Sequence, residues 1–232
     1  VVATIIALFL ICTKYQTVIV EIPKFGNKPV SIPDTASSTP PTSTLTTTNY
    51  SLPTTLLLPV PFTPQAPTAN WDELHNEACE EASAIMTSRY FMGDISSTLN
   101  PKLVEEEISK LTIWQDQNFG YHLSVNTEET ARMINEVYGL KTEIISDFSE
   151  ASIKKSLVEG KLIIFPANGR LLGNPNYKQP GPVYHMVVIK GYSETGFISN
   201  DPGTRNGLSY PYSFDTLSNA HATWDYSKNF VK

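Results

Sequence analysis

Apolar residues recur at two different spacings along this chain, and the change falls near its middle. Between residues 76 and 139 they repeat three and four positions apart, which is the spacing of one face of a helix. Beyond residue 140 they form short continuous or alternating runs, which predict strands. Helices followed by antiparallel strands indicate an α+β fold.

Three helices are expected in the first half, each with a recognisable start. Asn76 is a good N-cap for the first helix, and Pro101 stands in the first turn of the second. In the third, Asn126 and Glu129 can form a capping box. The expected bounds are 76–91, 101–118 and 126–139, and the second helix is expected to turn Leu103, Ile108, Leu111 and Trp114 toward a core.

The second half is expected to form the sheet. The predicted strands are 141–146, 161–165, 183–192 and 197–201, with one helix at 150–159. Residues 193–196 form a short turn, so the last two strands are expected to pair as a hairpin. Prolines restrict residues 56–62 to an edge strand or an extended lead-in. Residues 168–181, rich in Gly, Pro and Asn, are expected to form a surface loop.

The chain before residue 56 has a different character. Residues 1–12 are uncharged and almost wholly apolar, and both a signal-peptide core and a single-pass anchor fit them, with an uncleaved anchor preferred. The Pro, Thr and Ser that follow predict an extended linker. We therefore expect a membrane anchor or signal segment at 1–20, a linker at 21–55 and a compact domain at 56–232. This organisation predicts a protein at the cell surface, anchored in the membrane by its N-terminus, or a secreted one.

Composition excludes several classes of function. The net charge is −6, and the 17 Lys and Arg residues are scattered, so a nucleic-acid partner is not expected. Cys12 and Cys79 fall in segments of different character, which argues against a disulfide and leaves Cys79 as a free thiol. The four histidines are isolated, so neither a metal site nor another cofactor is expected.

Cys79 is the candidate nucleophile. In the first turn of the expected helix, the positive end of the helix dipole favours a thiolate. Glu77, Glu80 and Glu81 oppose this effect unless they face solvent or bind a partner. The alternative interpretation is a buried structural cysteine, since free Cys is among the most buried residue types.

A base for that thiol is available in the predicted hairpin. His185 and Asp201 lie 16 residues apart, and the fold of the hairpin brings them side by side. Asn200 is a rival partner, because strand alternation lets only one of Asn200 and Asp201 face the imidazole. The other histidines, His75, His122 and His221, are expected to be surface or hydrogen-bonded polar residues.

Four motifs in this order resemble a known family. They are Val-Pro-x-x-x-Gln ending at Gln65, Glu-Ala-Cys-Glu-Glu-Ala-Ser around Cys79, His-Met-Val-Val-Ile-Lys-Gly-Tyr from His185, and Asn-Asp-Pro-Gly around Asp201. Together they are similar to the papain-like cysteine peptidases of the family-39-like group, which are related to bacteriocin-leader-processing domains. The resemblance runs from about residue 57 to the end of the sequence and implies a helical part, with the nucleophile helix packed on a C-terminal antiparallel sheet.

The resemblance also implies roles and partners. It makes Cys79 the nucleophile, His185 the general base and acid, Asp201 the orienting group and Gln65 an oxyanion donor, acting on a peptide or protein substrate through a thioester. The sequence carries no transporter spans or P-loop, so a double-glycine leader is not carried over as the substrate. An amidase or acyltransferase with the same triad, and a non-catalytic binding module on the same fold, remain alternatives. The oligomeric state is not predicted.

Overall fold

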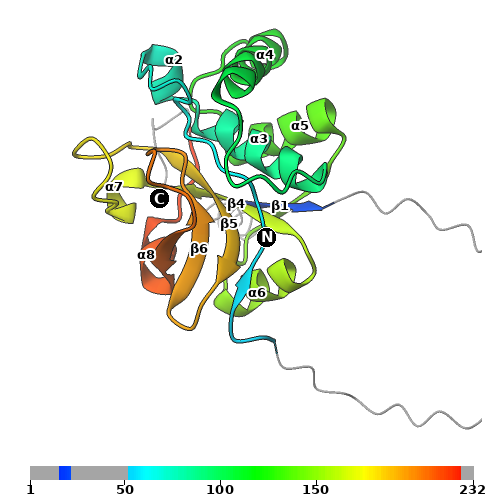
Figure 1. Cartoon of the computed structure of the whole chain (residues 1–232), viewed down its shortest axis with the longest axis vertical. Helices are drawn as coiled ribbons and strands as arrows, with labels where there is room; N and C mark the ends of the chain where they lie inside the picture. The colour runs from blue at the N-terminus through cyan, green and yellow to red at the C-terminus, as the bar shows by residue number, and fades with distance from the viewer. Residues whose placement is uncertain (1–15, 22–51, 226–232) are drawn as a thin grey trace, which may run out of the picture.

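The computed structural model describes residues 16–21 and 52–225, in which helices cover both faces of an antiparallel sheet (Figure 1). In chain order the elements are β1 (Thr17–Glu21), β2 (Leu56–Leu57), α2 (Glu73–Asn76), α3 (Cys79–Phe91), α4 (Pro101–Phe119), α5 (Thr127–Tyr138), β3 (Lys141–Ile145), α6 (Glu150–Val158), β4 (Leu162–Ala167), α7 (Gly169–Leu172), β5 (His185–Tyr192), β6 (Gly196–Asn200), β7 (Tyr210–Ser213) and α8 (Phe214–Ala220). This mixture of helices and antiparallel strands agrees with the predicted α+β class.

The sheet follows the order β3-β1-β4-β5-β6-β7, and β2 also pairs with β5. Every strand pair is antiparallel. The β5–β6 pair is the predicted hairpin, and its register places Val188 opposite Asn200. The first residue of β5, His185, lies opposite Ala167 at the end of β4. The start of β5 and the end of β6 therefore lie at the same edge of the sheet.

Each face of the sheet has its own apolar core, because alternate strand residues point to opposite faces. Val18 and Val20 pack with residues of α3, α4 and α5 on one face. Ile19, between them, packs with residues of α6 and α8 on the other. Figure 1 shows α3, α4 and α5 gathered on one side of the sheet and α6 on the opposite side. All eight residues of β5 are consequently buried.

The predicted helices are confirmed, with one error of orientation. Helix α4 has Asn100 as its N-cap and Pro101 in its first turn, and α5 carries the Asn126–Glu129 capping box. In α4, however, Leu103 is 56% exposed and the neighbouring Val104 is buried instead. The error is one residue in the phase of the apolar stripe.

The start of the cysteine helix differs from the prediction. Asn76 does not cap α3: it ends the short helix α2, which Asp72 caps by accepting a hydrogen bond from the backbone N–H of His75. Helix α3 begins at Cys79, and its N-cap residue, Ala78, makes no side-chain capping bond. The predicted surface loop 168–181 contains α7, and Tyr177 within it is buried. The elements β7 and α8 were not predicted.

Strand β1 overturns the predicted boundaries at the start of the chain. We expected residues 17–20 to belong to an apolar segment apart from the domain, but β1 lies inside the sheet between β3 and β4. The sheet therefore includes residues from both sides of 22–51. Residues 1–15 of the anchor or signal segment expected at 1–20, and residues 22–51 of the linker expected at 21–55, lie outside the described residues. Among the residues that are described, no helix has the length and apolar character needed to cross a bilayer.

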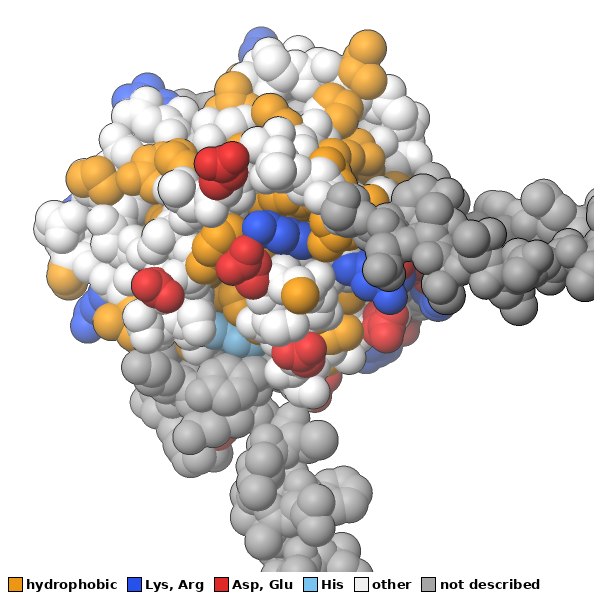
Figure 2. Space-filling model, turned by 90° about the horizontal axis from the view of Figure 1, so that it is seen from below, with side chains coloured by type: hydrophobic (Ala, Val, Ile, Leu, Met, Phe, Trp, Pro, Cys, Tyr) orange, Lys and Arg blue, Asp and Glu red, His pale blue; other side chains and the backbone are white. Residues whose placement is uncertain are grey.

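Charged side chains are mostly dispersed over the surface. On the face seen from below in Figure 2, acidic and basic groups stand among apolar ones without gathering by sign. Several form short-range pairs, such as Lys154 with Glu150 one helical turn away on α6. Exposed pairs of this kind contribute at most about 1 kcal/mol each, so the fold depends mainly on its two apolar cores.

Replacing Val20 by Asp in the full chain tests the place of β1. Because Val20 is fully buried opposite Leu162, an unpaired carboxylate there should lower the free energy of unfolding by roughly 4 kcal/mol or more. The measurement is urea unfolding followed by circular dichroism. Glu21→Gln is the control, since it alters only the ion pairs of Glu21 with Lys141 and Lys161 and should cost about 1 kcal/mol or less. Equal stability of the two variants would mean that β1 is not part of the sheet.

Candidate active site

His185 and Asp201 meet at the edge of the sheet where β5 begins and β6 ends. The imidazole Nε2 lies 2.8 Å from Oδ1 of Asp201. Both side chains are buried, at 1% and 0% exposure. The pairing predicted from the hairpin is therefore present as a direct contact.

Asp201 accepts hydrogen bonds from four further donors. The Tyr177 hydroxyl donates to Oδ2 over 2.6 Å, and Asn174 Nδ2 donates to the same oxygen over 2.9 Å. The Tyr212 hydroxyl also donates to Oδ2, and the backbone N–H of Gly203 donates to Oδ1 over 2.9 Å. Sequence reasoning missed these donors, because neither the loop residues Asn174, Tyr177 and Gly203 nor Tyr212 on β7 carry a local signal of a distant partner.

These contacts determine the charge of the carboxyl group. Burial is the largest single influence and would raise the pKa of Asp201, but the charge of His185 and the hydrogen bonds from His185, Tyr177 and Tyr212 leave that pKa lowered. Burial above all raises the pKa of Tyr177, so its hydroxyl keeps the proton that it donates. Because an ionised carboxylate only accepts hydrogen bonds, Nε2 of His185 must carry the proton in this contact.

Asn200 has a different task. Its Nδ2 donates to the backbone carbonyls of Val60 and Pro61 over 3.2 and 3.0 Å, and its Oδ1 accepts from the backbone N–H of Ser209. Strand alternation turns its side chain away from the imidazole. Asn200 therefore fastens the segment that leads to Gln65, and Asp201 is the residue that faces His185.

Cys79 is the first residue of α3, which packs against β5, and among the described residues its thiol forms no hydrogen bond with His185 or Asp201. Its thiol is 4% exposed and belongs to the same apolar cluster as Tyr184 and Met186, the two neighbours of His185. One turn along α3, the Ser83 hydroxyl donates to the backbone carbonyl of Met186 over 3.5 Å. Residues four apart on a helix share a face, so the face that bears the thiol is turned toward the start of β5.

The immediate surroundings of the thiol oppose its ionisation. Burial above all raises the pKa of Cys79 well above its usual value, and the carboxyl of Glu80 raises it further. The Sγ–H donates to Oε2 of Glu80 over 2.9 Å. The sequence predicted a thiolate favoured by the helix dipole, but burial and a neighbouring acid outweigh a dipole effect of about 1 kcal/mol.

Two of the three glutamates near the thiol are buried. Burial raises the pKa of Glu80 well above its usual value and that of Glu81 to about 7. Gln115 on α4 donates to Glu81, which anchors that carboxyl inside the helical layer. Glu77 is only partly buried and accepts from the hydroxyl of Ser124 over 3.0 Å. Glu80 and Glu81 therefore do not face solvent, and the objection that they raise to a thiolate at Cys79 is not removed by exposure.

Gln65 lies close to the same region, but its amide is already engaged. Its Nε2 donates to the backbone carbonyls of His75 and Asn76 over 2.8 and 3.0 Å, which uses both amide hydrogens. Its backbone N–H donates to the carbonyl of Pro202 over 2.9 Å, next to Asp201. To donate to a further oxygen, the side chain would have to release one of the two carbonyls.

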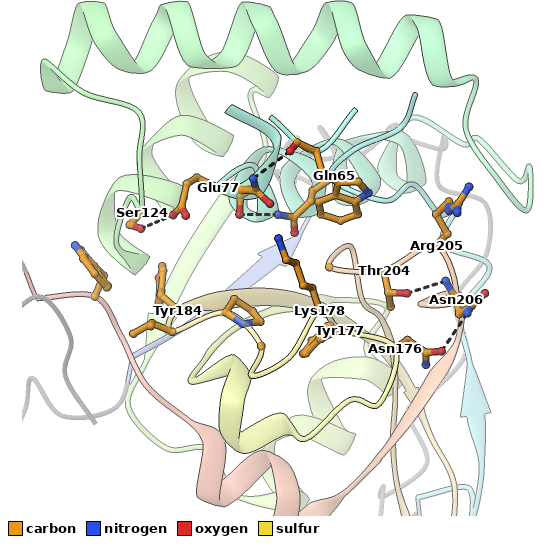
Figure 3. Close-up of a pocket in the computed structure, with 17 residues that line it drawn as sticks. Gln65, Glu77, Ser124, Asn176, Tyr177, Lys178, Tyr184, Thr204, Arg205 and Asn206 are labelled. Carbon is orange, nitrogen blue, oxygen red and sulfur yellow. Dashed lines mark hydrogen bonds between the residues drawn. The ribbon is translucent and has the colours of Figure 1, made fainter. Parts of the chain in front are cut away.

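A cavity of about 910 Å³ is lined by Gln65 and by sequence neighbours of Cys79, His185 and Asp201 (Figure 3). Its lining includes Gln65, Glu77 two residues before Cys79, and Tyr184 just before His185. Gly203 also lines it, and a Cβ added there would lie 2.9 Å from Cε1 of His185. Cys79, His185 and Asp201 do not themselves line the cavity. Tyr177, which packs against the ring of His185, does line it. This volume suits a segment of peptide or a small ligand.

The other three histidines are hydrogen-bonded outside this centre, as expected. His75 is buried and pairs with Asp72 and Glu105, each at 2.7 Å. His122 pairs with Asp116 at 2.8 Å. His221 contacts the Thr17 hydroxyl at 2.9 Å, and burial lowers its pKa to about 4, so it is neutral at physiological pH. Within residues 16–21 and 52–225, no cluster of His, Cys, Asp and Glu has the form of a metal site.

Replacing Glu80 by Gln should shift the ionisation of Cys79 to lower pH. The substitution removes the acid that competes with the thiol for charge, while burial of the thiol remains. The measurement is the rate of iodoacetamide alkylation of the Cys79 peptide, by mass spectrometry, from pH 6 to 10. Glu81→Gln is the matched control and should give a smaller shift, because Glu81 affects the thiol less than Glu80 does. Identical pH profiles for all three proteins would refute this role of Glu80.

Comparison with known protein families matches residues 57–231 to the Peptidase_C39 like family. Searches of curated proteins and of solved structures returned no match. The matched range covers about three quarters of the chain and contains all four motifs on which the resemblance was based. The chain belongs to the Peptidase_C39 like family.

Proposed function

We propose that this protein is a cysteine peptidase of papain-like design, which hydrolyses peptide bonds through a thioester on Cys79. His185 acts as general base and acid, and Asp201 orients it. The observation that carries the proposal is the buried hydrogen bond between His185 Nε2 and Asp201, at the end of the strand on which the cysteine helix packs. Family membership supports the same reaction class.

The Asp201 contact prepares the imidazole for this role. With the proton of the neutral ring held on Nε2, the other nitrogen, Nδ1, has a free lone pair and can accept a proton. A general base needs that tautomer. The four other donors to Asp201 keep the carboxylate ionised and fixed, so the imidazolium formed during the reaction is stabilised as well.

The reaction then proceeds in two balanced halves. In the first, Nδ1 of His185 takes the thiol proton while Sγ of Cys79 attacks the peptide carbonyl carbon, and the C–N bond breaks as the imidazolium gives that proton to the leaving amine. In the second, water attacks the thioester carbon while His185 takes a proton from the water, and the C–S bond breaks as the imidazolium returns that proton to Sγ. The products are an amine, a carboxylic acid and the regenerated thiol.

The oxyanion of each tetrahedral intermediate needs hydrogen-bond donors. The start of α3 has no side-chain cap, which supports the backbone N–H of Cys79 as one donor. Gln65 is the second donor in this proposal, and it would act by exchanging one of its two carbonyl partners for the oxyanion. Its backbone hydrogen bond to Pro202, the residue after Asp201, keeps Gln65 near the proposed site and supports this role.

The raised pKa of the thiol is compatible with this chemistry. Because Cys79 rests as a thiol, its proton moves to His185 only when substrate is attacked. Burial raises the pKa of Glu80, which favours the neutral form of this carboxyl beside the sulfur. Ionisation of Glu80 would bring a negative charge beside the sulfur and slow the attack.

The location of the protein is proposed from sequence alone. The apolar residues 1–12 support attachment to a membrane or export, with the domain at the cell surface or outside the cell. Because β1 follows soon after, such an anchor would hold the sheet close to the membrane.

Peptide hydrolysis and thiol labelling together test the proposal. The wild-type protein should cleave members of a mixed peptide library, and a peptide aldehyde should block both cleavage and alkylation of Cys79. Cys79→Ala should abolish cleavage, and His185→Ala and Asp201→Asn should each lower kcat/KM by roughly a thousandfold or more. The control is His122→Ala, a surface histidine outside the site, which should retain full activity.

Three results would redirect or reject the proposal. Cleavage of non-peptide amides in place of peptides would identify an amidase, and transfer to an added amine in place of water would identify an acyltransferase. Alkylation of Cys79 no faster than that of a free thiol, with no turnover of any library, would indicate a binding module.

A further inference from the structure

We propose that Lys178 and Arg205 form a carboxylate-binding wall of the cavity and select substrates with an acidic residue. The inference rests on the proposed function, because it concerns the substrate that reaches Cys79. Both residues line the cavity, and Figure 3 shows Lys178 extending from its loop into the space between the two walls.

Neither cation is neutralised within the described residues. Five other described basic residues pair with carboxylates at 4 Å or less, namely Arg89, Arg132, Lys141, Lys154 and Lys161. The remaining described ones form no such pair but lie outside the cavity lining, namely Lys102, Lys110, Lys155, Arg170 and Lys190. Lys178 and Arg205 form no ion pair with any described residue, although the chain has 23 acidic residues and only 17 basic ones. Two unpaired cations in a cavity of an acidic protein create a local positive potential that attracts a carboxylate.

The two loops that carry these cations are joined to each other. Asn206, next to Arg205, donates from Nδ2 to Oδ1 of Asn176 over 3.0 Å, and Figure 3 shows this bond on the lower wall. The backbone N–H of Asn206 also donates to the hydroxyl of Thr204. The two cations therefore belong to one wall, whose parts keep their relative positions.

The same wall is fixed against the candidate active site. Tyr177, which precedes Lys178, donates to Asp201 and packs edge-on against the ring of His185, with ring centroids 5.5 Å apart. Gly203, near the start of the other loop, donates to Asp201 as well. A carboxylate bound by Lys178 or Arg205 would thus be held at a defined position relative to the imidazole, which is what substrate selection requires.

The opposite wall has a different character. Glu77 lies there with its carboxylate held by Ser124, and Trp71 and Trp224 add apolar surface. An anionic group is repelled from the Glu77 side and attracted to the Lys178 side. The cavity therefore discriminates between the two directions in which an acidic peptide could lie.

Peptides that differ by one charge test this inference. Chloroacetyl peptides with Glu or the isosteric Gln at the first, second or third position would alkylate Cys79, and the Glu/Gln rate ratio removes differences in intrinsic reactivity. Wild-type protein should favour Glu at one position. Lys178→Gln and Arg205→Gln should each lower that ratio about two- to fivefold. Raising the salt concentration should also lower it, because exposed charges are screened.

Lys102→Gln is the matched control. It removes one positive charge from an exposed position on α4, outside the cavity, and should leave the ratio unchanged. Two results would overturn the carboxylate-binding wall. One is a wild-type Glu/Gln rate ratio near one at every position, and the other is a raised ratio that is unchanged in the Lys178→Gln, Arg205→Gln double variant.

A separate binding measurement distinguishes failure of this inference from failure of the proposed function. In Cys79→Ala, Trp fluorescence titrations with Glu and Gln peptides report affinity without chemistry. If Cys79 reacts no faster than a free thiol, the proposed peptidase function fails. The ratio of the two peptide affinities then decides by itself whether the wall binds a carboxylate. Tighter binding of the Glu peptide that Lys178→Gln removes supports the wall, and equal affinities refute it.

Discussion

The buried carboxylate of Asp201 is the constraint on which the rest of the site depends. It lies at the end of β6, with no exposure to water, and must find all its hydrogen bonds within the protein. Its donors come from the start of β5, from the loop after α7, from the turn after β6 and from β7. One charge thereby fixes the histidine tautomer and also ties together the loops that form a wall of the cavity.

The first turn of α3 sets a second constraint, which acts against the first. Burial and the adjacent Glu80 raise the pKa of Cys79, whereas the proposed reaction requires His185 to take the thiol proton. The two effects are reconciled if the sulfur ionises only during attack. The account therefore differs from a resting thiolate–imidazolium pair, and it makes the protonation state of Glu80 part of the chemistry.

Local sequence signals predicted the elements whose stabilising contacts are also local. The capping box of α5 and the β5–β6 hairpin each depend on residues close together in sequence, and both were predicted. The contact between His185 and Asp201 was predicted from that hairpin. Strand β1 was missed because its apolar residues continue an apolar segment, and its partners in β3 and β4 lie more than 100 residues away.

Competition between similar local signals caused the other errors. Asp72 and Asn76 are both good N-cap residues. The sequence could not show that Asp72 would cap a short helix that ends at Asn76. The donors to Asp201 and the unpaired cations of the cavity depend on which loops meet in three dimensions. No spacing in the sequence encodes those meetings.

A crystal structure of the protein after reaction with a peptide aldehyde would test the central claim most directly. The account predicts a bond between Sγ of Cys79 and the aldehyde carbon, Nδ1 of His185 within hydrogen-bond distance of the adduct, and Nε2 still against Asp201. An unmodified Cys79, or an adduct from which the imidazole is turned away with its bond to Asp201 broken, would contradict it.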